Sequence, residues 1–427
     1  MEKEIGYRLK NGIEIYTYKN PSLHSFYISL FVKAGSMYEE ESENGITHFL
    51  EHTVIRNVNK LFDGELYSIL DRNGIEFNAS TYSEMVQFYV CGATESFSVG
   101  ADVISRALCP IILDSDELRA ERDRIKAEIR ESDDKTSLAT FASGIVHEGT
   151  SLSRPILGTL GGVSKITAKR LENYRKRVFT SDNLFFYVTG NFSDEDIRTL
   201  SEQIEICEFF SGEEHDNFAP VPEKFGKREE TVHIKNADFT MVRFNFDMDM
   251  TRLSVPVTDL LYDILLSGYN SRFFIEMSEK RGLFYDLTGS LERYNNIGTF
   301  TFSYEVRPDA LYSAVEMTLS ILSEIKEKLS CEDECMKAGY VKNAYLLYDD
   351  PRELNFTFAY DNHVTNNGYS SLSERSESYR KVTPEQIRDA ARMIFTENNL
   401  TLTIKGNKKK IDGQRLSELV RDFGSKG

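Results

Sequence analysis

The five residues HFLEH, from His48 to His52, carry the strongest chemical signal in the sequence. Positions i, i+3 and i+4 share one face of an α-helix, so a helix here places two imidazoles and the Glu51 carboxylate side by side. Neutral imidazole is a common zinc ligand, and a catalytic zinc site needs a third protein ligand and one open position. Zinc lowers the pKa of a water bound to it to about 7. Glu51 is therefore expected to be the general base that takes the proton of this water.

Two histidines on an amphipathic helix can also be a surface pair or a pair within the core. The chain has only 7 histidines in 427 residues, however, and the order H-x-x-E-H is a known zinc-peptidase signature. We therefore favour the zinc interpretation and predict that His48 and His52 bind the metal. The remaining histidines have no ligand spacing and are expected to be structural or surface residues: His24, His147, His215, His233 and His363.

A third ligand must come from a separate element of the fold. Residues 116–131, DELRAERDRIKAEIRE, are expected to form a helix. Glu121 and Glu128 are seven residues apart in it, which places them two turns apart on one face. One carboxylate could bind a metal, and another could orient a ligand. From these residues alone, an exposed charged helix remains the favoured interpretation.

The HFLEH segment is followed by E-R-x-x-x-x-x-E, whose final residue, Glu128, lies 76 residues after His52. Together these two motifs resemble the pitrilysin/insulinase family of inverted-zincin metallopeptidases. The resemblance is to the two-domain branch, which includes the mitochondrial processing peptidase subunits and bacterial relatives. It implies one zinc ion per chain, bound by His48, His52 and Glu128. It also implies that Glu51 is the general base and that Glu121 supports a ligand. Residues 155–159 (PILGT) and 185–191 match further segments of the family.

The same resemblance indicates where substrate would bind. Residues 78–81 match the N-A-x-T segment of the family, an edge strand that pairs with the substrate backbone; they are Asn78, Ala79, Ser80 and Thr81. In the family, a Tyr of the second domain reaches the substrate seven residues after an Arg. Residues 280–285, KRGLFY, align with this region and give Tyr285 as a catalytic residue. Ser278 occupies the position of the Arg, and Arg281 is the candidate to replace it.

The sequence contains an internal repeat. Residues 166–191 and 382–407 align without gaps at an offset of 216, and each copy reads as a Thr-capped helix, a turn and a strand ending in Gly-Asn. An offset near half the chain length implies two copies of one fold. We predict a zinc-binding catalytic domain over 1–210, a linker over 211–228, and a homologous domain over 229–427. The second domain lacks the HxxEH motif and is expected to serve substrate contact and assembly.

The periodicity of the remaining segments predicts the fold class. Alternating stretches at 26–34, 83–91, 239–246 and 299–306 indicate strands, and 62–73 and 97–108 indicate helices. Long antiparallel strands with interspersed helices favour the α+β class. Each domain is expected to be a mostly antiparallel sheet with helices packed on one face.

Composition narrows the range of partners and locations. The net charge of −17 and the pI near 5.1 argue against nucleic acid, which requires a basic surface. The acidity serves solubility or, alternatively, an acidic chamber that favours basic peptides. No apolar run approaches 18 residues, so no membrane association is expected. The start MEKEI has no signal-peptide pattern, and five scattered cysteines suit a reducing compartment, so we expect a cytoplasmic protein.

These observations together predict a zinc-dependent endopeptidase that cleaves unstructured peptides or a precursor peptide. The resemblance implies a chamber formed by paired subunits, either a homodimer or a heterodimer with a related subunit. Ser278 keeps open an alternative, a non-catalytic or partner-dependent subunit of a heterodimeric peptidase. A zinc hydrolase with a non-peptide substrate is a further alternative. The predicted edge strand over 78–81 argues against it, because a small molecule has no use for backbone pairing.

Overall fold

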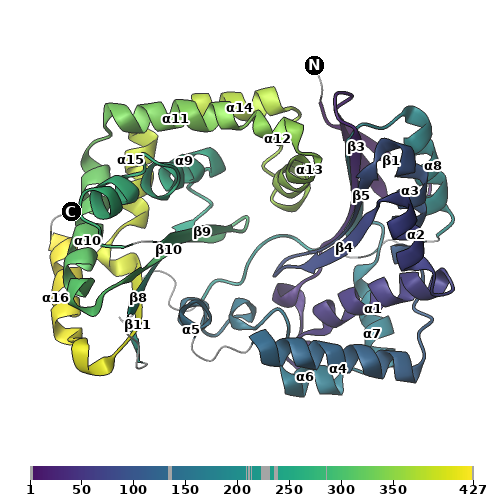
Figure 1. The fold of residues 1–427 in the computed structure, drawn as a ribbon, viewed down its shortest axis with the longest axis horizontal. Helices are drawn as coiled ribbons and strands as arrows, with labels where there is room; N and C mark the ends of the chain where they lie inside the picture. Colours follow the sequence, from purple (N-terminus) through teal and green to yellow (C-terminus); the bar gives the residue numbers. More distant parts are fainter. Residues whose placement is uncertain are drawn as a thin grey trace. The chain divides into compact units, whose positions relative to one another are not determined.

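The computed structural model describes residues 3–132, 137–207, 209, 212, 214–222, 231–234, 239–284 and 286–425 (Figure 1). The chain divides into two compact units, and each is described separately. Unit 1 comprises Met1–Asp133, Arg154–Asn217 and Tyr345–Leu372, and unit 2 comprises Asp134–Ser153, Phe218–Ala344 and Ser373–Gly427. The chain passes from one unit to the other between Asn217 and Phe218, within the predicted linker 211–228. Residues 211, 213 and 223–228 of that linker lie outside the described residues.

Unit 1 contains a six-stranded sheet in the order β1-β2-β6-β3-β5-β4. Only β2 and β6 pair in parallel; the other neighbours are antiparallel. Successive side chains of a strand point to opposite faces, and alternate residues of β3 (Phe26, Ile28 and Leu30) enter the main core. The strands are β1 (Ile5–Arg8), β2 (Glu14–Lys19), β3 (Ser25–Val32), β4 (Glu76–Thr81), β5 (Val86–Ala93) and β6 (Leu184–Gly190).

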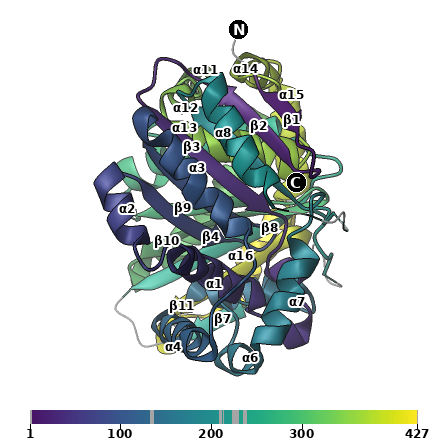
Figure 2. The same ribbon diagram turned by 90° about the vertical axis from the view of Figure 1, so that its right-hand side faces the viewer.

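Helices cover the core face of this sheet. α1 presents Ile46, Phe49, Leu50, Val54 and Val58 to the core, at the three- and four-residue spacing that forms one helical face. Figure 2 shows α3 and α8 next to each other, and they are in contact. The helices that the first half of the sequence contributes to unit 1 are α1 (Ile46–Leu61), α2 (Leu66–Asn73), α3 (Phe97–Ser105), α4 (Ser115–Ser132), α6 (Leu160–Lys165), α7 (Ala168–Val178) and α8 (Asp194–Glu205).

Unit 2 contains a five-stranded sheet in the order β7-β11-β8-β10-β9, in which β7 and β11 are parallel and the other neighbours antiparallel. Its strands are β7 (Thr231–Ile234), β8 (Thr240–Asp249), β9 (Leu287–Arg293), β10 (Ile297–Val306) and β11 (Leu400–Gly406). The helices that the second half of the sequence contributes to this unit are α9 (Val255–Leu266), α10 (Leu311–Glu327), α11 (Cys331–Asn343), α14 (Leu372–Arg380), α15 (Pro384–Ile394) and α16 (Gly413–Ser425).

The two sheets share one topology. The order and strand directions of β2-β6-β3-β5-β4 recur in β7-β11-β8-β10-β9. α7 and β6 in the first half correspond to α15 and β11 in the second, as the sequence repeat predicts. The repeat extends to the helix caps, because the Thr167 and Thr383 hydroxyls each accept the N–H group three residues on, from Arg170 and Gln386. The predicted α+β fold with two similar domains is confirmed.

Each unit also includes one helical segment from the other half of the sequence. α12 (Leu346–Asp349) and α13 (Pro351–Ala359) belong to unit 1, and α5 (Leu138–Val146) belongs to unit 2. α13 packs on β3 and β6, and α5 packs on β8 and β11. The compact units therefore differ in these two segments from the continuous domains, 1–210 and 229–427, expected from the sequence.

A buried asparagine holds α13 on the sheet. Asn355 is fully buried; it accepts a hydrogen bond from Ser29 Oγ at 2.8 Å and donates one to the Tyr187 carbonyl at 2.9 Å. Ser29 points away from the core face, because its neighbours Ile28 and Leu30 occupy that face. α13 therefore covers the second face of the sheet of unit 1. None of the helices in the described parts of the chain combines the length and apolar character that crossing a bilayer requires.

Candidate metal centre

The HFLEH motif lies on α1, whose first turn is held by a buried carboxylate. Glu39 Oε2 accepts the N–H of Gly45 at 2.8 Å, and Glu39 Oε1 accepts the N–H of Thr47 at 2.9 Å. The first N–H groups of a helix have no partner within the helix, so Glu39 acts as its cap. Gly45 has a φ of +91°, and a Cβ there would lie 2.8 Å from the Gly158 Cα. Both the backbone conformation and the close approach require glycine at this helix start.

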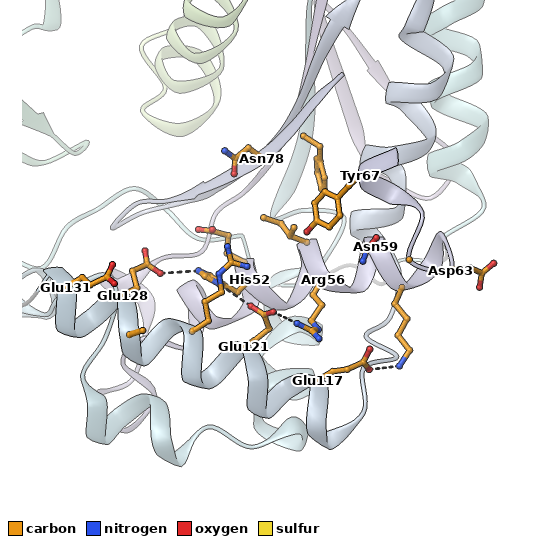
Figure 3. A pocket seen from close by; sticks show the side chains of 17 residues that line it. His52, Arg56, Asn59, Asp63, Tyr67, Asn78, Glu117, Glu121, Glu128 and Glu131 are labelled. Carbon is orange, nitrogen blue, oxygen red and sulfur yellow. Dashed lines mark hydrogen bonds and ion pairs between the residues drawn. The ribbon is translucent and has the colours of Figure 1, made fainter. Parts of the chain in front are cut away.

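α4 runs beside α1 (Figure 3). It brings Glu128 close to both His48 and His52. Glu128 Oε1 lies 3.7 Å from His48 Nε2, and Glu128 Oε2 lies 3.4 Å from His52 Nε2. The candidate ligand atoms of these three residues all lie within 4.8 Å of one another. Ligands of a tetrahedral zinc with bonds of 2.0–2.1 Å lie about 3.4 Å apart. Two imidazoles and one carboxylate at this spacing fit a zinc ion.

Glu121, two turns before Glu128 on α4, lies behind His52. Its Oε2 is 3.3 Å from His52 Nδ1, and its Oε1 accepts a hydrogen bond from Arg56 Nη1 at 2.6 Å. Although burial raises the pKa of Glu121, its hydrogen bonds with His52 and Arg56 hold that pKa below its ordinary value. An ionised Glu121 accepts the Nδ1 proton of His52 and leaves Nε2 free for a metal.

His48 is held in a different way, by burial. Its exposed fraction is 5%, and burial together with the nearby His52 lowers its pKa to about 3. The imidazole is therefore neutral at physiological pH, which is the form that binds a metal. Within the described residues, His48 Nδ1 is buried without a hydrogen-bond partner.

Glu51 lies beside these ligands and contacts the edge strand. It is buried, and its Oε2 accepts a hydrogen bond from the Thr81 hydroxyl at the end of β4. Burial raises the pKa of Glu51; Thr81 and His52 act in the opposite direction, and Glu128 raises it further. A carboxylate that is oriented and partly desolvated in this way is suited to accept a proton from a nearby water.

Residues 78–81 lie on β4, which is the terminal strand of its sheet; among the described residues, its one partner strand is β5. The exposed Asn78 lines a cavity beside the metal centre and accepts the N–H of Ala79 through its Oδ1 at 2.9 Å. Ala79, Ser80 and Thr81 are half-buried. The free edge of a terminal strand offers unpaired backbone groups to another extended chain.

The cavity has a volume of about 1000 Å³ and lies between α1, α4 and β4 (Figure 3). Ion pairs of Arg56 with Glu121 and of Lys60 with Glu117 line its floor. It is lined by Glu51, His52, Ile55, Arg56, Asn59, Lys60, Asp63, Gly64, Tyr67, Phe77, Asn78, Glu117, Glu121, Arg124, Ala127, Glu128 and Glu131. Of the predicted metal, base and edge-strand residues, four line this cavity of unit 1: His52, Glu128, Glu51 and Asn78.

The substrate residues predicted in the second half belong to unit 2. Tyr285 lies outside the described residues. Arg281 Nη1 donates to the Glu276 carbonyl at 2.6 Å and to Glu276 Oε2 at 3.0 Å, so its guanidinium is bonded back to the helix that precedes it in the sequence. Ser278 lies in the neighbouring π-helix, η6 (Phe274–Glu279).

Three contributions to the site were not recognised from the sequence. They are the hydroxyl contact of Thr81 with Glu51, the bond of Arg56 to Glu121 and the capping of α1 by Glu39. Arg56 follows His52 by four residues and so shares its helical face, a signal that was available. Glu39 and Thr81 reach α1 from other elements, and their spacing in the sequence gives no indication of this.

Two family models match adjoining parts of the chain. Residues 14–160 match the model described as Insulinase (Peptidase family M16), and residues 165–335 match the model described as Peptidase M16 inactive domain. The second description agrees with the lack of an HxxEH motif in the second half.

Named relatives extend the similarity to nearly the whole length. The chain is 24% identical over 406 residues to the "Uncharacterized zinc protease" of Rickettsia felis, covering 94% of this chain and 97% of that protein. It is 24% identical over 398 residues to the "Uncharacterized zinc protease YmxG" of Bacillus subtilis, with 92% and 96% covered.

Solved structures share the fold. A protease from Helicobacter pylori superposes with a TM-score of 0.84 at 18% identity, covering 95% of this chain and all (100%) of that one. An M16-like peptidase from Alicyclobacillus acidocaldarius gives a TM-score of 0.82 at 16% identity, covering 95% and 99%. The motif, the duplicated fold and the two adjoining family matches agree, and the chain belongs to the pitrilysin/insulinase family, peptidase family M16.

Proposed function

We propose that this chain is a zinc-dependent endopeptidase that hydrolyses unstructured peptides. The observation that carries the proposal is the convergence of His48, His52 and Glu128 beside the buried Glu51, at the end of β4, the terminal strand of its sheet. The relatives named as zinc proteases support the same reaction class.

In this proposal, His48, His52 and Glu128 hold one zinc ion. Zinc, when bound, supplies Lewis acidity that polarises the scissile carbonyl and acidifies a water. Glu51 takes the proton of the attacking water and later transfers a proton to the leaving amine. The Thr81 hydroxyl holds the Glu51 carboxylate in place. Glu121 fixes the tautomer and orientation of His52.

The edge strand β4 gives the proposal its substrate class. An extended peptide that adds to β4 is bound through its backbone, which requires a chain free of other secondary structure. Asn78, Ala79, Ser80 and Thr81 would contact it. The Ala79 N–H now bonds to the Asn78 side chain, and a substrate carbonyl would replace that acceptor. The preferred substrates are therefore unstructured peptides or an unfolded segment of a precursor.

The second half of the chain is assigned to substrate contact and assembly. We propose that two subunits pair to enclose the site, as a homodimer or with a related subunit, and that Tyr285 and Arg281 contact substrate. Arg281 would first have to leave Glu276. All five cysteines are free thiols, which agrees with a cytoplasmic location.

Ser278 supports the alternative of a partner-dependent or non-catalytic subunit, because it stands where the family resemblance expects Arg. In that case, a related subunit would supply the missing guanidinium. Ser278→Arg in the purified chain separates the two candidates. A gain of cleavage of tenfold or more supports partner dependence, and unchanged activity of an already active homodimer contradicts it.

The experiment that tests the proposed function is cleavage of a library of unstructured peptides by the zinc-loaded chain. Chelator-sensitive cleavage, with folded proteins left intact, is the expected result, and Glu128→Gln should abolish it. Asp123→Asn removes an exposed carboxylate from the same helix and should leave cleavage unchanged. Absence of cleavage by a chain with bound zinc would contradict the proposal and favour the partner-dependent alternative.

A further inference from the structure

The first residue of the edge strand β4 is bound by an arginine of α13. Figure 1 shows α13 on the side of β4 that faces away from α1 and α4. Arg352 Nη2 of α13 donates to Glu76 Oε2 at 2.9 Å, and Glu76 begins β4. Thr81, at the other end of the strand, contacts Glu51 of α1. Residues five apart point to opposite faces of a strand, so one face of β4 meets the metal centre and the other meets Arg352.

The guanidinium of Arg352 rests on an aromatic surface. Tyr27 of β3 and Tyr89 of β5 are stacked, with ring centroids 5.2 Å apart. The guanidinium carbon lies 5.6 Å from the Tyr27 ring centroid and 5.2 Å from the Tyr89 ring centroid, a distance at which a cation is attracted to the ring face. At the backbone, Asp350 Oδ1 accepts the N–H of Arg352 at 2.9 Å and caps α13. The charged group is therefore held beside β4 before any substrate binds.

Both carboxylate oxygens of Glu76 have partners, whereas Arg352 has donors to spare. Glu76 Oε1 accepts from the Tyr89 hydroxyl at 2.7 Å, and Oε2 accepts from Arg352 and lies 3.8 Å from Cys91 Sγ. Arg352 makes its contacts with Glu76 and Cys91 through Nη2. Its Nε and Nη1 have no hydrogen-bond partner among the described residues. The Arg352 side chain is 46% exposed, so it can bind a further acceptor.

A peptide that pairs with β4 presents alternate side chains to the face of the sheet on which Arg352 lies. Directly opposed residues of neighbouring strands share one face, with Cβ atoms about 4.5–5.5 Å apart. The substrate residue opposite Glu76 is therefore within reach of Arg352. Glu76 precedes Asn78, which lines the metal cavity, and Thr81, which contacts Glu51. This substrate residue thus lies about two to five positions from the scissile bond.

We propose that Arg352 selects peptides that carry an acidic residue at the position opposite Glu76. The inference rests on the proposed endopeptidase function, with β4 as the strand that binds the peptide. The carboxylate of a substrate Asp or Glu accepts a charge-assisted hydrogen bond from the free N–H groups of Arg352. A substrate Lys or Arg meets a like charge there, and the Glu76 carboxylate that could attract it is already paired.

The test measures binding as well as cleavage, so that this inference and the proposed function can fail separately. A labelled unstructured peptide is prepared with Glu at each position in turn, with a matched set that carries Gln instead. Fluorescence anisotropy gives Kd for the zinc-loaded Glu51→Gln chain, and the wild type gives kcat/KM and the cleavage site. We expect Glu to be favoured over Gln about fivefold at one position, because the pair is partly exposed. The preference should shrink as salt is added.

Variants assign the preference to one side chain. Arg352→Gln should abolish it in both measurements, whereas Arg198→Gln, which removes an exposed, ion-paired arginine from α8, should retain it. The double exchange of Glu76→Arg with Arg352→Glu keeps an ion pair at the start of β4 and should favour Lys over Glu in the peptide. This exchange also guards against a loss of strand structure in the single variant.

The possible outcomes are distinct. A preference for Glu that survives Arg352→Gln, or a wild-type preference for Lys, would overturn the role of Arg352 and leave the peptidase function intact. Selective binding without cleavage by the wild type would support the role of Arg352 and contradict the proposed function. Peptides that neither bind nor are cleaved would contradict both.

Discussion

The two imidazoles of the HFLEH motif are prepared for a metal by different contacts. Glu121 accepts a hydrogen bond from His52 and another from Arg56, whereas His48 is kept neutral by burial. The candidate metal centre therefore includes two residues, Glu121 and Arg56, that are not among its three candidate ligands. Such partners set ligand orientation and basicity.

Glu121→Gln should weaken zinc binding by about 10- to 100-fold, because the amide is a poorer acceptor for the His52 Nδ1 proton. Affinity is measured by competition with a chromogenic chelator. Asp123→Asn, an exposed carboxylate on the same helix, is the matched control and should bind zinc as the wild type does. Equal affinities for Glu121→Gln and wild type would show that Glu121 has no supporting role.

Thr81→Val should lower kcat by about 10- to 150-fold, because a hydrogen bond to a charged group is worth about 1.5–3 kcal/mol. The substitution removes the hydroxyl that orients Glu51 but keeps the shape of the side chain on β4. KM should change little, since backbone pairing along the strand is preserved. Thr81→Ser should restore kcat; if Ser fails to do so, the hydroxyl is not the relevant group.

At this scale, the sequence was sufficient to predict that His48, His52 and Glu128 lie together, because a helical period places the first two and the family resemblance supplies the third. The contact of Thr81 with Glu51 was not predictable. It arises where the end of an edge strand passes over α1, and that crossing depends on the packing of the whole sheet.

At the scale of single elements, the attachment of α13 to the sheet of unit 1 depends on one buried side chain. Asn355 is fully buried between the helix and the sheet and bonds to Ser29 and to the Tyr187 carbonyl. Asn355→Leu should destabilise unit 1 by about 2–4 kcal/mol, because it leaves several buried polar groups without partners. Urea unfolding measures the change. Glu353→Gln, exposed on the same helix, should be near neutral, and an equal effect of both substitutions would contradict the anchoring role.

A buried carboxyl group on α9 makes the stability of unit 2 depend on pH. Burial, with a contribution from Asp259, raises the pKa of Asp263 from 3.8 to about 6. The folded state therefore binds this proton more tightly than the unfolded state. Ionisation of Asp263 therefore destabilises the folded state. This destabilisation is absent below pH 3.8, grows as the pH rises to about 6, and is complete above it. Asp263→Asn should stabilise unit 2 by about 1–3 kcal/mol at pH 8 and have little effect near pH 4. A stabilisation that is independent of pH would show that titration of Asp263 is not its cause.

The sequence predicted the ends of a helix correctly where the apolar pattern was regular. The prediction was wrong where the local backbone conformation set the end of the helix. The helix predicted over 62–73 begins only at Leu66. Asp63 and Gly64 have φ values of 53° and 86°, so they form a left-handed turn between α1 and α2. By contrast, the helix predicted over 116–131 is observed as Ser115–Ser132, because its charged face and apolar positions at Leu118, Ile125 and Ile129 keep the helical period.

The whole molecule is built from two halves that each contribute a helical segment to the other unit. This exchange was not predictable, because the apolar pattern of 138–146 or the pattern of 351–359 specifies a helix but not the sheet on which it packs. The duplication itself was predictable from the repeat at 166–191 and 382–407, which keeps both capping residues and strand ends.

A fragment ending at residue 217 should therefore fail to fold, because it lacks the α13 segment that covers the second face of the unit 1 sheet. Adding a peptide of residues 345–372 should recover structure, measured by near-UV circular dichroism. The same peptide with Asn355→Leu is the control. A fragment that folds without any peptide would contradict the dependence of unit 1 on the exchanged segment.

The central claim is that Glu51 acts as the base beside a zinc ion held by His48, His52 and Glu128. The most direct measurement compares zinc content and peptide cleavage of Glu51→Gln with those of the wild type. We predict one zinc per chain in both proteins and a loss of kcat of at least about 10³-fold in the variant, since Gln cannot accept the proton. Cleavage by Glu51→Gln at a rate near that of the wild type, with zinc bound, would contradict the account.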